Sequence, residues 1–123
     1  MKKPTLDKLV RTLVALGVPG LILVVAVSVS GLSGGAAIVA ALAMLGGPLG
    51  MVGGIAALGA IVLISDALAD DGFELLFRRV LKGLRKKGKS KGSILRTIHS
   101  LPISHRLRSK GRKYVERYWD DDH

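Results

Sequence analysis

The pattern of hydrophobic and polar residues divides the chain into an uncharged first half and a basic second half. From Thr12 to Ser65 the sequence has no charged residue and no Asn, Gln or His, a run of 54 of the 123 positions. Glycine interrupts the run at 11 positions. The rest of the chain is short, polar and basic, so it offers little to bury such a run. The pattern therefore predicts helices that cross a membrane.

The first part of the run predicts one long helix. It is expected over residues 6–30, with Thr5 as its N-cap and apolar residues following at helical spacing. A kink is expected near Pro19, because a proline ring removes a backbone donor inside a helix. Residues 31–35, which are rich in glycine, predict a turn after this helix.

The second part of the run predicts a short helix and a second long one. The short helix, residues 36–45, is about 15 Å long and cannot span a bilayer. The Gly-Gly-Pro sequence at 46–48 breaks it, and Pro48 suits the first turn of a further helix over 48–69. The predicted transmembrane domain, residues 1–71, thus has two spans with a short apolar hairpin or re-entrant helix between them.

The charges at the two ends of the run predict its topology. Four of the 19 basic residues precede the run, and the other 15 follow it. Positively charged flanks stay on the cytoplasmic side, so only an even number of spans fits. We therefore expect two spans with both termini cytoplasmic. The basic start and residues 13–30 also resemble a cleaved signal peptide, but the apolar sequence after them favours an uncleaved helix.

Small residues at regular spacing predict close helix packing. Gly46, Gly50 and Gly54 recur every four residues and so share one helix face. They indicate either tight packing inside one subunit or a glycine zipper between subunits, and we favour a homo-oligomer because two helices bury little surface alone. Asp66 is the acidic residue within the second predicted span. In an oligomer it would form an acidic ring at a pore mouth; otherwise it faces water at the helix end.

Residues 72–123 predict a small basic helical domain. Within 73–85 apolar residues recur at i, i+3, i+4 and i+7, which is typical of an amphipathic helix, and the opposite face is basic. Such a helix lies on an anionic membrane surface or packs within its own domain. The sequence does not separate these two interpretations.

Two shorter helices are expected after the glycine- and lysine-rich linker at 86–92. Ser90 or Ser93 can cap the first of them, and Pro102 ends it. Ser104 can cap the last helix. The three helices together predict a compact unit after the spans.

The last helix concentrates basic residues, some on one face and some flanking it. They are Arg106, Arg108, Lys110, Arg112, Lys113 and Arg117. Such faces neutralise phosphates, so we predict a polyanionic ligand, a nucleotide or single-stranded nucleic acid. Tyr114, Tyr118 and Trp119 could stack on bases, although tyrosines in such a pattern more often belong to the core. Lipid headgroups are the other class of anion that would explain the basic residues.

No pattern in the sequence indicates catalysis. The chain has no Cys, which excludes disulfides, thiol catalysis and Cys-based metal sites. His99 and His105 form no ligand motif with a nearby acid. The glycine clusters lack the Lys and Ser or Thr of a phosphate-binding loop. We therefore expect no enzymatic activity, no cofactor, no metal site and no small-molecule substrate.

The order of an apolar helix over Leu13–Val29, a glycine-rich segment over Gly46–Gly59 and a short basic helical tail resembles the small two-span, channel-forming effectors of bacterial anti-phage defence, of the Hailong type. The resemblance implies a toxin effector whose pore depolarises the inner membrane. It also implies that Gly46–Gly59 lines or packs the pore and that the basic face of the last helix holds the controlling ligand.

These observations predict an all-α membrane protein with domains 1–71 and 72–123. Its expected function is that of a homo-oligomeric inner-membrane ion channel or membrane-disrupting effector, controlled by a nucleotide or nucleic acid. Two alternatives remain. One is a membrane anchor that presents a basic helical module to a partner, and the other is a cationic membrane-active peptide similar to a bacteriocin or holin.

Overall fold

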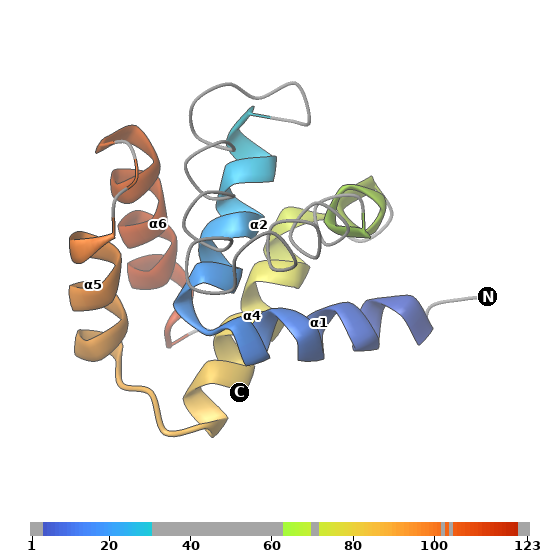
Figure 1. The fold of residues 1–123 in the computed structure, drawn as a ribbon, viewed down its shortest axis with the longest axis horizontal. Helices are drawn as coiled ribbons and strands as arrows, with labels where there is room; N and C mark the ends of the chain where they lie inside the picture. Colours follow the sequence, from blue (N-terminus) through green and yellow to red (C-terminus); the bar gives the residue numbers. More distant parts are fainter. Residues whose placement is uncertain (1–3, 31–62, 70–71, 102, 104, 121–123) are drawn as a thin grey trace, which may run out of the picture.

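The protein is built from helices that surround one central helix. The computed structural model describes residues 4–30, 63–69, 72–101, 103 and 105–120, and all regular elements among them are helical. The labelled helices are α1 (Pro4–Leu16), α2 (Val18–Ser30), α4 (Phe73–Lys86), α5 (Lys91–Ser100) and α6 (His105–Tyr118), and residues 63–69 are also helical. In Figure 1 α2 runs through the middle, with α5 and α6 on one side of it.

Helix α2 is buried on all its faces. Every side chain from Leu21 to Val27 is at most 5% exposed. The helix contacts α1, α4, α5 and α6, and each of these turns an apolar face toward it. A helix that is hydrophobic all round needs such complete burial. Residues on both sides of position 71 thus contribute to a single hydrophobic core.

This arrangement overturns the predicted membrane architecture. Within the described ranges, no helix combines the length and the apolar character that crossing a bilayer requires. The first predicted span consists of two helices of 13 residues each, and each is about 20 Å long, against a hydrocarbon core of about 30 Å. The all-helical class is confirmed, but the predictions of a membrane protein, of pore-forming spans and of an inner-membrane location with cytoplasmic termini are wrong.

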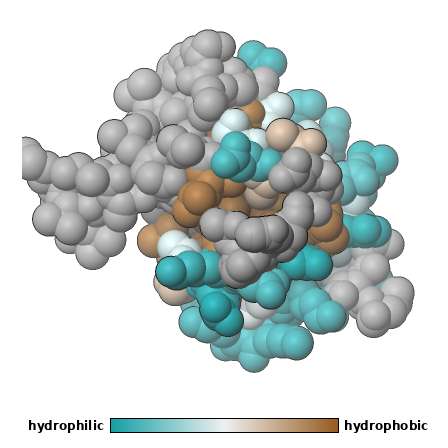
Figure 2. Space-filling model, turned by 90° about the vertical axis from the view of Figure 1, so that its right-hand side faces the viewer, coloured by the Kyte–Doolittle hydropathy of each residue, from teal (hydrophilic) through white to brown (hydrophobic). Residues whose placement is uncertain are grey.

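The error has a physical cause. A membrane is required only if the rest of the chain cannot bury the apolar residues. In the structure, α1 supplies a face with Leu6, Leu9 and Leu13, and α4 supplies a face of five buried residues. Figure 2 shows hydrophobic residues gathered in the middle of one face of the molecule, with hydrophilic residues around them. Amphipathic neighbours therefore cover α2 in the way that lipid was expected to.

The break between α1 and α2 lies at Gly17, two residues before the predicted kink at Pro19. Gly17 has a φ of 80°, a conformation that residues with a side chain rarely adopt, and its N–H donates to the carbonyl of Val14 at 3.0 Å. Pro19 then lies in the first turn of α2, where its missing N–H costs nothing. The glycine, rather than the proline, ends the helix.

Several predictions fall on residues that the structure does not describe. The helix at 36–45 lies outside the described residues, as do Gly46, Gly50 and Gly54. Of the second predicted span, 48–69, the structure describes 63–69. These residues are helical, and Asp66 among them is exposed.

The helices of the second half are close to those predicted. Helix α4 covers the predicted 73–85 and buries Leu76, Phe77, Val80, Leu81 and Leu84. Ser90, rather than Ser93, caps α5, because its side-chain oxygen accepts a hydrogen bond from the Ser93 N–H at 3.1 Å. Helix α5 ends at Ser100, two residues before the predicted stop at Pro102. These elements position the basic residues described below.

Candidate polyanion-binding surface

Helix α6 buries one stripe of residues and exposes most of its basic ones. The stripe consists of Leu107, Gly111, Val115 and Tyr118, and the helix packs against α2 and α5. Gly111 permits the close approach to α2, because a Cβ there would lie 3.3 Å from Cδ1 of Ile22. Burial of this stripe decides which way each arginine and lysine of α6 points.

Four of the six basic residues predicted to bind a polyanion share one face. We call them the α6 basic row: Arg106, Lys110, Lys113 and Arg117. Three are exposed and Lys110 is half-buried. Tyr114 lies between the row and the buried stripe, and it contacts Phe73 of α4 at a ring-centroid distance of 4.6 Å. The row therefore lies on the α4 side of α6 and extends over about 16 Å, with about 5–6 Å between neighbours.

The other two predicted residues lie elsewhere. Arg108 is half-buried, and its Nη2 donates to the carbonyl oxygens of Leu101 at 3.1 Å and Ile103 at 3.4 Å. It thus ties α6 to the backbone beyond the end of α5, where the Leu101 carbonyl also accepts the Ile103 N–H at 2.9 Å. Arg112 is exposed one turn before Glu116, whose Oε1 pairs with Nζ of Lys91 on α5 at 2.8 Å. The structure therefore separates both arginines from the α6 basic row.

The tyrosines belong to the core. Tyr118 is 5% exposed, and Tyr114 is half-buried. Phe77 of α4 contacts both of them, with ring-centroid distances of 5.8 Å to Tyr114 and 5.9 Å to Tyr118. Core packing is therefore the correct interpretation, and these rings are not open platforms for bases.

Two arginines from different helices converge on Tyr118. The guanidinium of Arg117 lies 5.7 Å from the ring centroid, and that of Arg78, on α4, lies 5.5 Å from it. Cations at these distances are attracted to the ring. Burial, with a side-chain hydrogen bond to Glu74, raises the pKa of the Tyr118 phenol above its ordinary value. The phenol therefore stays neutral at physiological pH. Because Arg78 and Arg117 lie at the same ring, Arg78 extends the α6 basic row onto α4.

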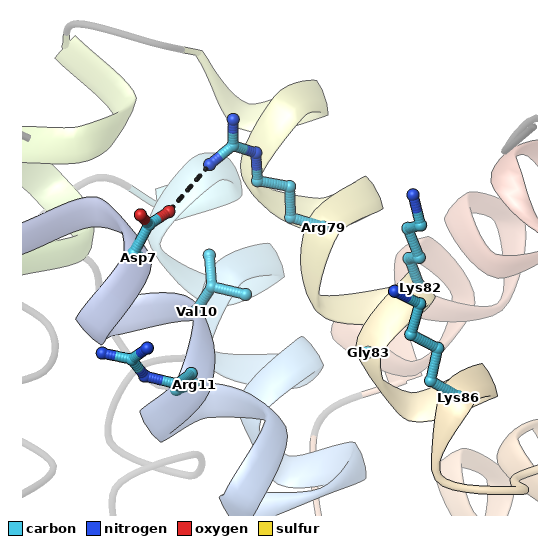
Figure 3. A pocket seen from close by; sticks show the side chains of 7 residues that line it. All are labelled: Asp7, Val10, Arg11, Arg79, Lys82, Gly83 and Lys86. Atoms are coloured by element: carbon cyan, nitrogen blue, oxygen red, sulfur yellow. Dashed lines mark hydrogen bonds and ion pairs between the residues drawn. The ribbon is translucent and has the colours of Figure 1, made fainter. Parts of the chain in front are cut away.

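A second group of basic residues lies between α1 and α4, and the sequence analysis did not identify it. We call this hollow of about 330 Å³ the α1–α4 groove, lined by Asp7, Val10, Arg11, Arg79, Lys82, Gly83 and Lys86. Figure 3 shows Asp7 on α1 and Arg79 on α4 pointing toward each other, while the side chain of Arg11 extends away from α4. Arg79 donates from Nη1 to Oδ1 of Asp7 at 3.5 Å. Gly83, a glycine inside an amphipathic helix, was the one sequence signal of a close approach here.

No protein family, curated protein or solved structure matches this chain. Nothing in these comparisons bears on the resemblance to channel-forming effectors.

Asp66, the one remaining predicted site residue that the structure describes, does not join either basic region. Asp66 lies on the helical segment 63–69, exposed, and it does not line the α1–α4 groove. In the part of the chain that the structure describes, no three His, Asp or Glu side chains gather as metal ligands. The chemistry that the described surface offers is the binding of anions by arginine and lysine.

Proposed function

We propose that the protein binds nucleic acid through its phosphates, without reading base sequence, at the α6 basic row and Arg78. The observation that carries this proposal is the convergence of Arg78 and Arg117 on the ring of Tyr118, at 5.5 and 5.7 Å. This convergence joins cations of two helices into one surface.

The spacing of the cations suits a ligand with regularly repeated negative charges. The α6 basic row presents a cation at each turn of α6, about 5–6 Å apart, and arginine binds phosphate oxygens through two parallel hydrogen bonds. A net charge of +10 on 123 residues attracts a polyanion from a distance. A nucleic acid backbone provides such a row of charges, whereas a single acidic side chain does not.

The aromatic residues argue against recognition of bases. Tyr118 is buried and has two guanidinium groups at its ring, and Trp119 has the guanidinium of Arg85 at 5.0 Å. Open rings are what single-strand binders use to stack bases. We therefore expect similar affinity for single strands of different sequence.

The proposal keeps the ligand class expected from the sequence and leaves out the channel, because the described helices do not cross a bilayer. It does not depend on assembly. The predicted homo-oligomer stays a prediction, since Gly46, Gly50 and Gly54, on which it rests, lie outside the described residues.

The test is a salt titration of binding to a short labelled oligonucleotide of mixed sequence, read by fluorescence anisotropy. Five phosphate contacts predict a slope of log K against log salt of about −3.5 for a single strand. The double variant Lys113→Gln/Arg117→Gln removes two of these contacts, so the slope should become shallower by about 1.4. Circular dichroism of the variant confirms that the helices are retained.

The matched control is Arg96→Gln/Arg112→Gln. It removes the same charge from two exposed residues outside the α6 basic row, so its slope should stay that of the original protein. An equal change of slope in both double variants would mean that net charge alone attracts the ligand. Saturable binding to phosphatidylserine vesicles with none to oligonucleotides would also contradict the proposal, because the basic surface would then serve a lipid headgroup.

A further inference from the structure

The α1–α4 groove differs from the α6 basic row because it is concave. Its floor is formed where α1 and α4 approach most closely, and Gly83 makes that approach possible. A Cβ at Gly83 would come within 2.5 Å of Cγ2 of Val14. The long side chains of Arg79, Lys82 and Lys86 lie on the α4 side of the groove, and Asp7 lies on the α1 side (Figure 3). The groove therefore exposes several cationic side chains to a small ligand.

Basic side chains predominate among the residues that line the groove. Four cationic side chains line it, and Asp7 is the one carboxylate among its lining residues. The Asp7 contact to Arg79 is 3.5 Å long, and the two side chains are 73% and 43% exposed. An ion pair so exposed contributes little to stability and exchanges readily with water. An entering anion with more than one charge can therefore displace Asp7 from Arg79.

The size and lining of the groove limit what it can hold. A volume of about 330 Å³ is at the lower end for small-molecule sites. Val10 and Gly83 are the lining residues without charge, and the lining includes no aromatic ring on which a base or sugar could stack. Arginine and lysine bind phosphate oxygens by short charge-assisted hydrogen bonds. The recognisable part of a ligand is therefore its phosphate.

We propose that the α1–α4 groove is a binding site for a diphosphate group, held by Arg79 and Lys86 of α4, and that the Asp7 carboxylate competes with it for Arg79. The ligand class comprises inorganic pyrophosphate and the diphosphate of a nucleotide. The site is separate from the α6 basic row, and it does not rest on the proposed binding of nucleic acid.

The test is isothermal titration of the full chain with inorganic pyrophosphate. We expect saturable binding with one ligand per chain. Arg79→Gln should weaken it about tenfold, the loss expected for one charge-assisted hydrogen bond. Asp7→Asn should strengthen it about threefold, because the competing charge is removed from an exposed ion pair. Lys86→Gln provides a second variant that should weaken binding, and it keeps the Asp7 contact intact.

Two controls make the result specific to the groove. Lys113→Gln/Arg117→Gln should leave pyrophosphate affinity unchanged and weaken oligonucleotide binding. Arg79→Gln should weaken pyrophosphate binding and leave oligonucleotide affinity unchanged. Arg96→Gln/Arg112→Gln should change neither. A loss of pyrophosphate affinity in either double variant as large as that in Arg79→Gln would overturn the assignment to the groove.

The remaining outcomes also decide the matter. No saturable binding at millimolar pyrophosphate would overturn the site, and unchanged affinity in Asp7→Asn would overturn the competition. ADP should bind as pyrophosphate does, since the groove contacts phosphates. Much tighter binding of ADP would show that the nucleoside is recognised and would contradict a site for the diphosphate alone. Failure of oligonucleotide binding with intact pyrophosphate binding would reject the proposed function and leave this inference standing.

Discussion

The Arg85 guanidinium donates a hydrogen bond of 2.9 Å from Nη1 to the backbone carbonyl oxygen of Trp119. The same guanidinium lies 5.0 Å from the centroid of the indole ring. Arg85 is in the last turn of α4, and Trp119 directly follows α6. One side chain therefore connects the C-terminal ends of two helices that are distant in sequence.

Replacing Arg85 should loosen this connection. Arg85→Met keeps the aliphatic stem and removes the hydrogen bond and the cation–π contact, so the free energy of unfolding should fall by about 1–2 kcal/mol. Urea unfolding followed by circular dichroism measures the change. Trp119 is the single tryptophan, and its fluorescence should shift toward that of an exposed indole. Arg96→Met, at an exposed position of α5, is the control and should stay within about 0.5 kcal/mol; equal effects would contradict the role of Arg85.

Gly20 should tolerate no side chain. A Cβ at Gly20 would overlap the backbone carbonyl of Leu13, which cannot move aside without shifting α1. Gly20→Ala should therefore lower the free energy of unfolding by about 3 kcal/mol through overpacking. Gly92→Ala is the matched control: its Cβ would meet the flexible end of Arg96 at 3.5 Å, so better helix propensity should stabilise the protein by up to about 1 kcal/mol. Thermal unfolding of both variants compares the two effects, and a stable Gly20→Ala would show that α1 and α2 cross elsewhere.

The ionisation of Tyr118 should be delayed. Burial, followed by the hydrogen bond to the Glu74 carboxylate, raises the pKa of its phenol above 10.0. The folded state thus holds this proton more tightly than the unfolded chain, so the corresponding stability is complete below pH 10.0 and is lost as pH rises through the folded-state pKa. Ultraviolet titration of tyrosinate in a Tyr114→Phe background isolates this group.

Glu74→Gln tests the second cause of that shift. Loss of the carboxylate should move the Tyr118 midpoint back toward 10.0 without reaching it, because burial is the larger cause. A midpoint that does not respond would show that Glu74 has no part in the shift. A midpoint at the ordinary value in the unaltered sequence would contradict the burial of the hydroxyl.

The start of α5 should depend on Ser90. Its side-chain oxygen accepts the Ser93 N–H at 3.1 Å, and loss of such a cap costs about 1 kcal/mol. Ser90→Ala should lower the free energy of urea unfolding by this amount and speed hydrogen exchange at the Ser93 amide. Ser109→Ala, exposed within α6, should instead be neutral or slightly stabilising. Unchanged exchange at Ser93 would indicate that another group caps the helix.

Local patterns predicted the helices of the second half well. The apolar spacing over 73–85 identified α4 because helical periodicity is a property of neighbouring residues. The same reasoning identified the α6 basic row, whose spacing alone places its members on one face. It also included Arg108, whose hydrogen bonds go to carbonyls at Leu101 and Ile103. Those partners precede α6, and only the packing of α5 on α6 brings them within reach.

Local residue patterns suffice to show that the chain forms helices, which faces of α1, α4, α5 and α6 are apolar, and which residues of α6 share a basic face. What covers α2 is a matter of tertiary packing, because hydrophobic burial is not directional and such a helix satisfies it equally well in lipid or among amphipathic helices. The α1–α4 groove also exists only because two distant helices pack together. Asp7 and Arg79 are 72 residues apart, and no local pattern specifies that two helices so separated will pack together.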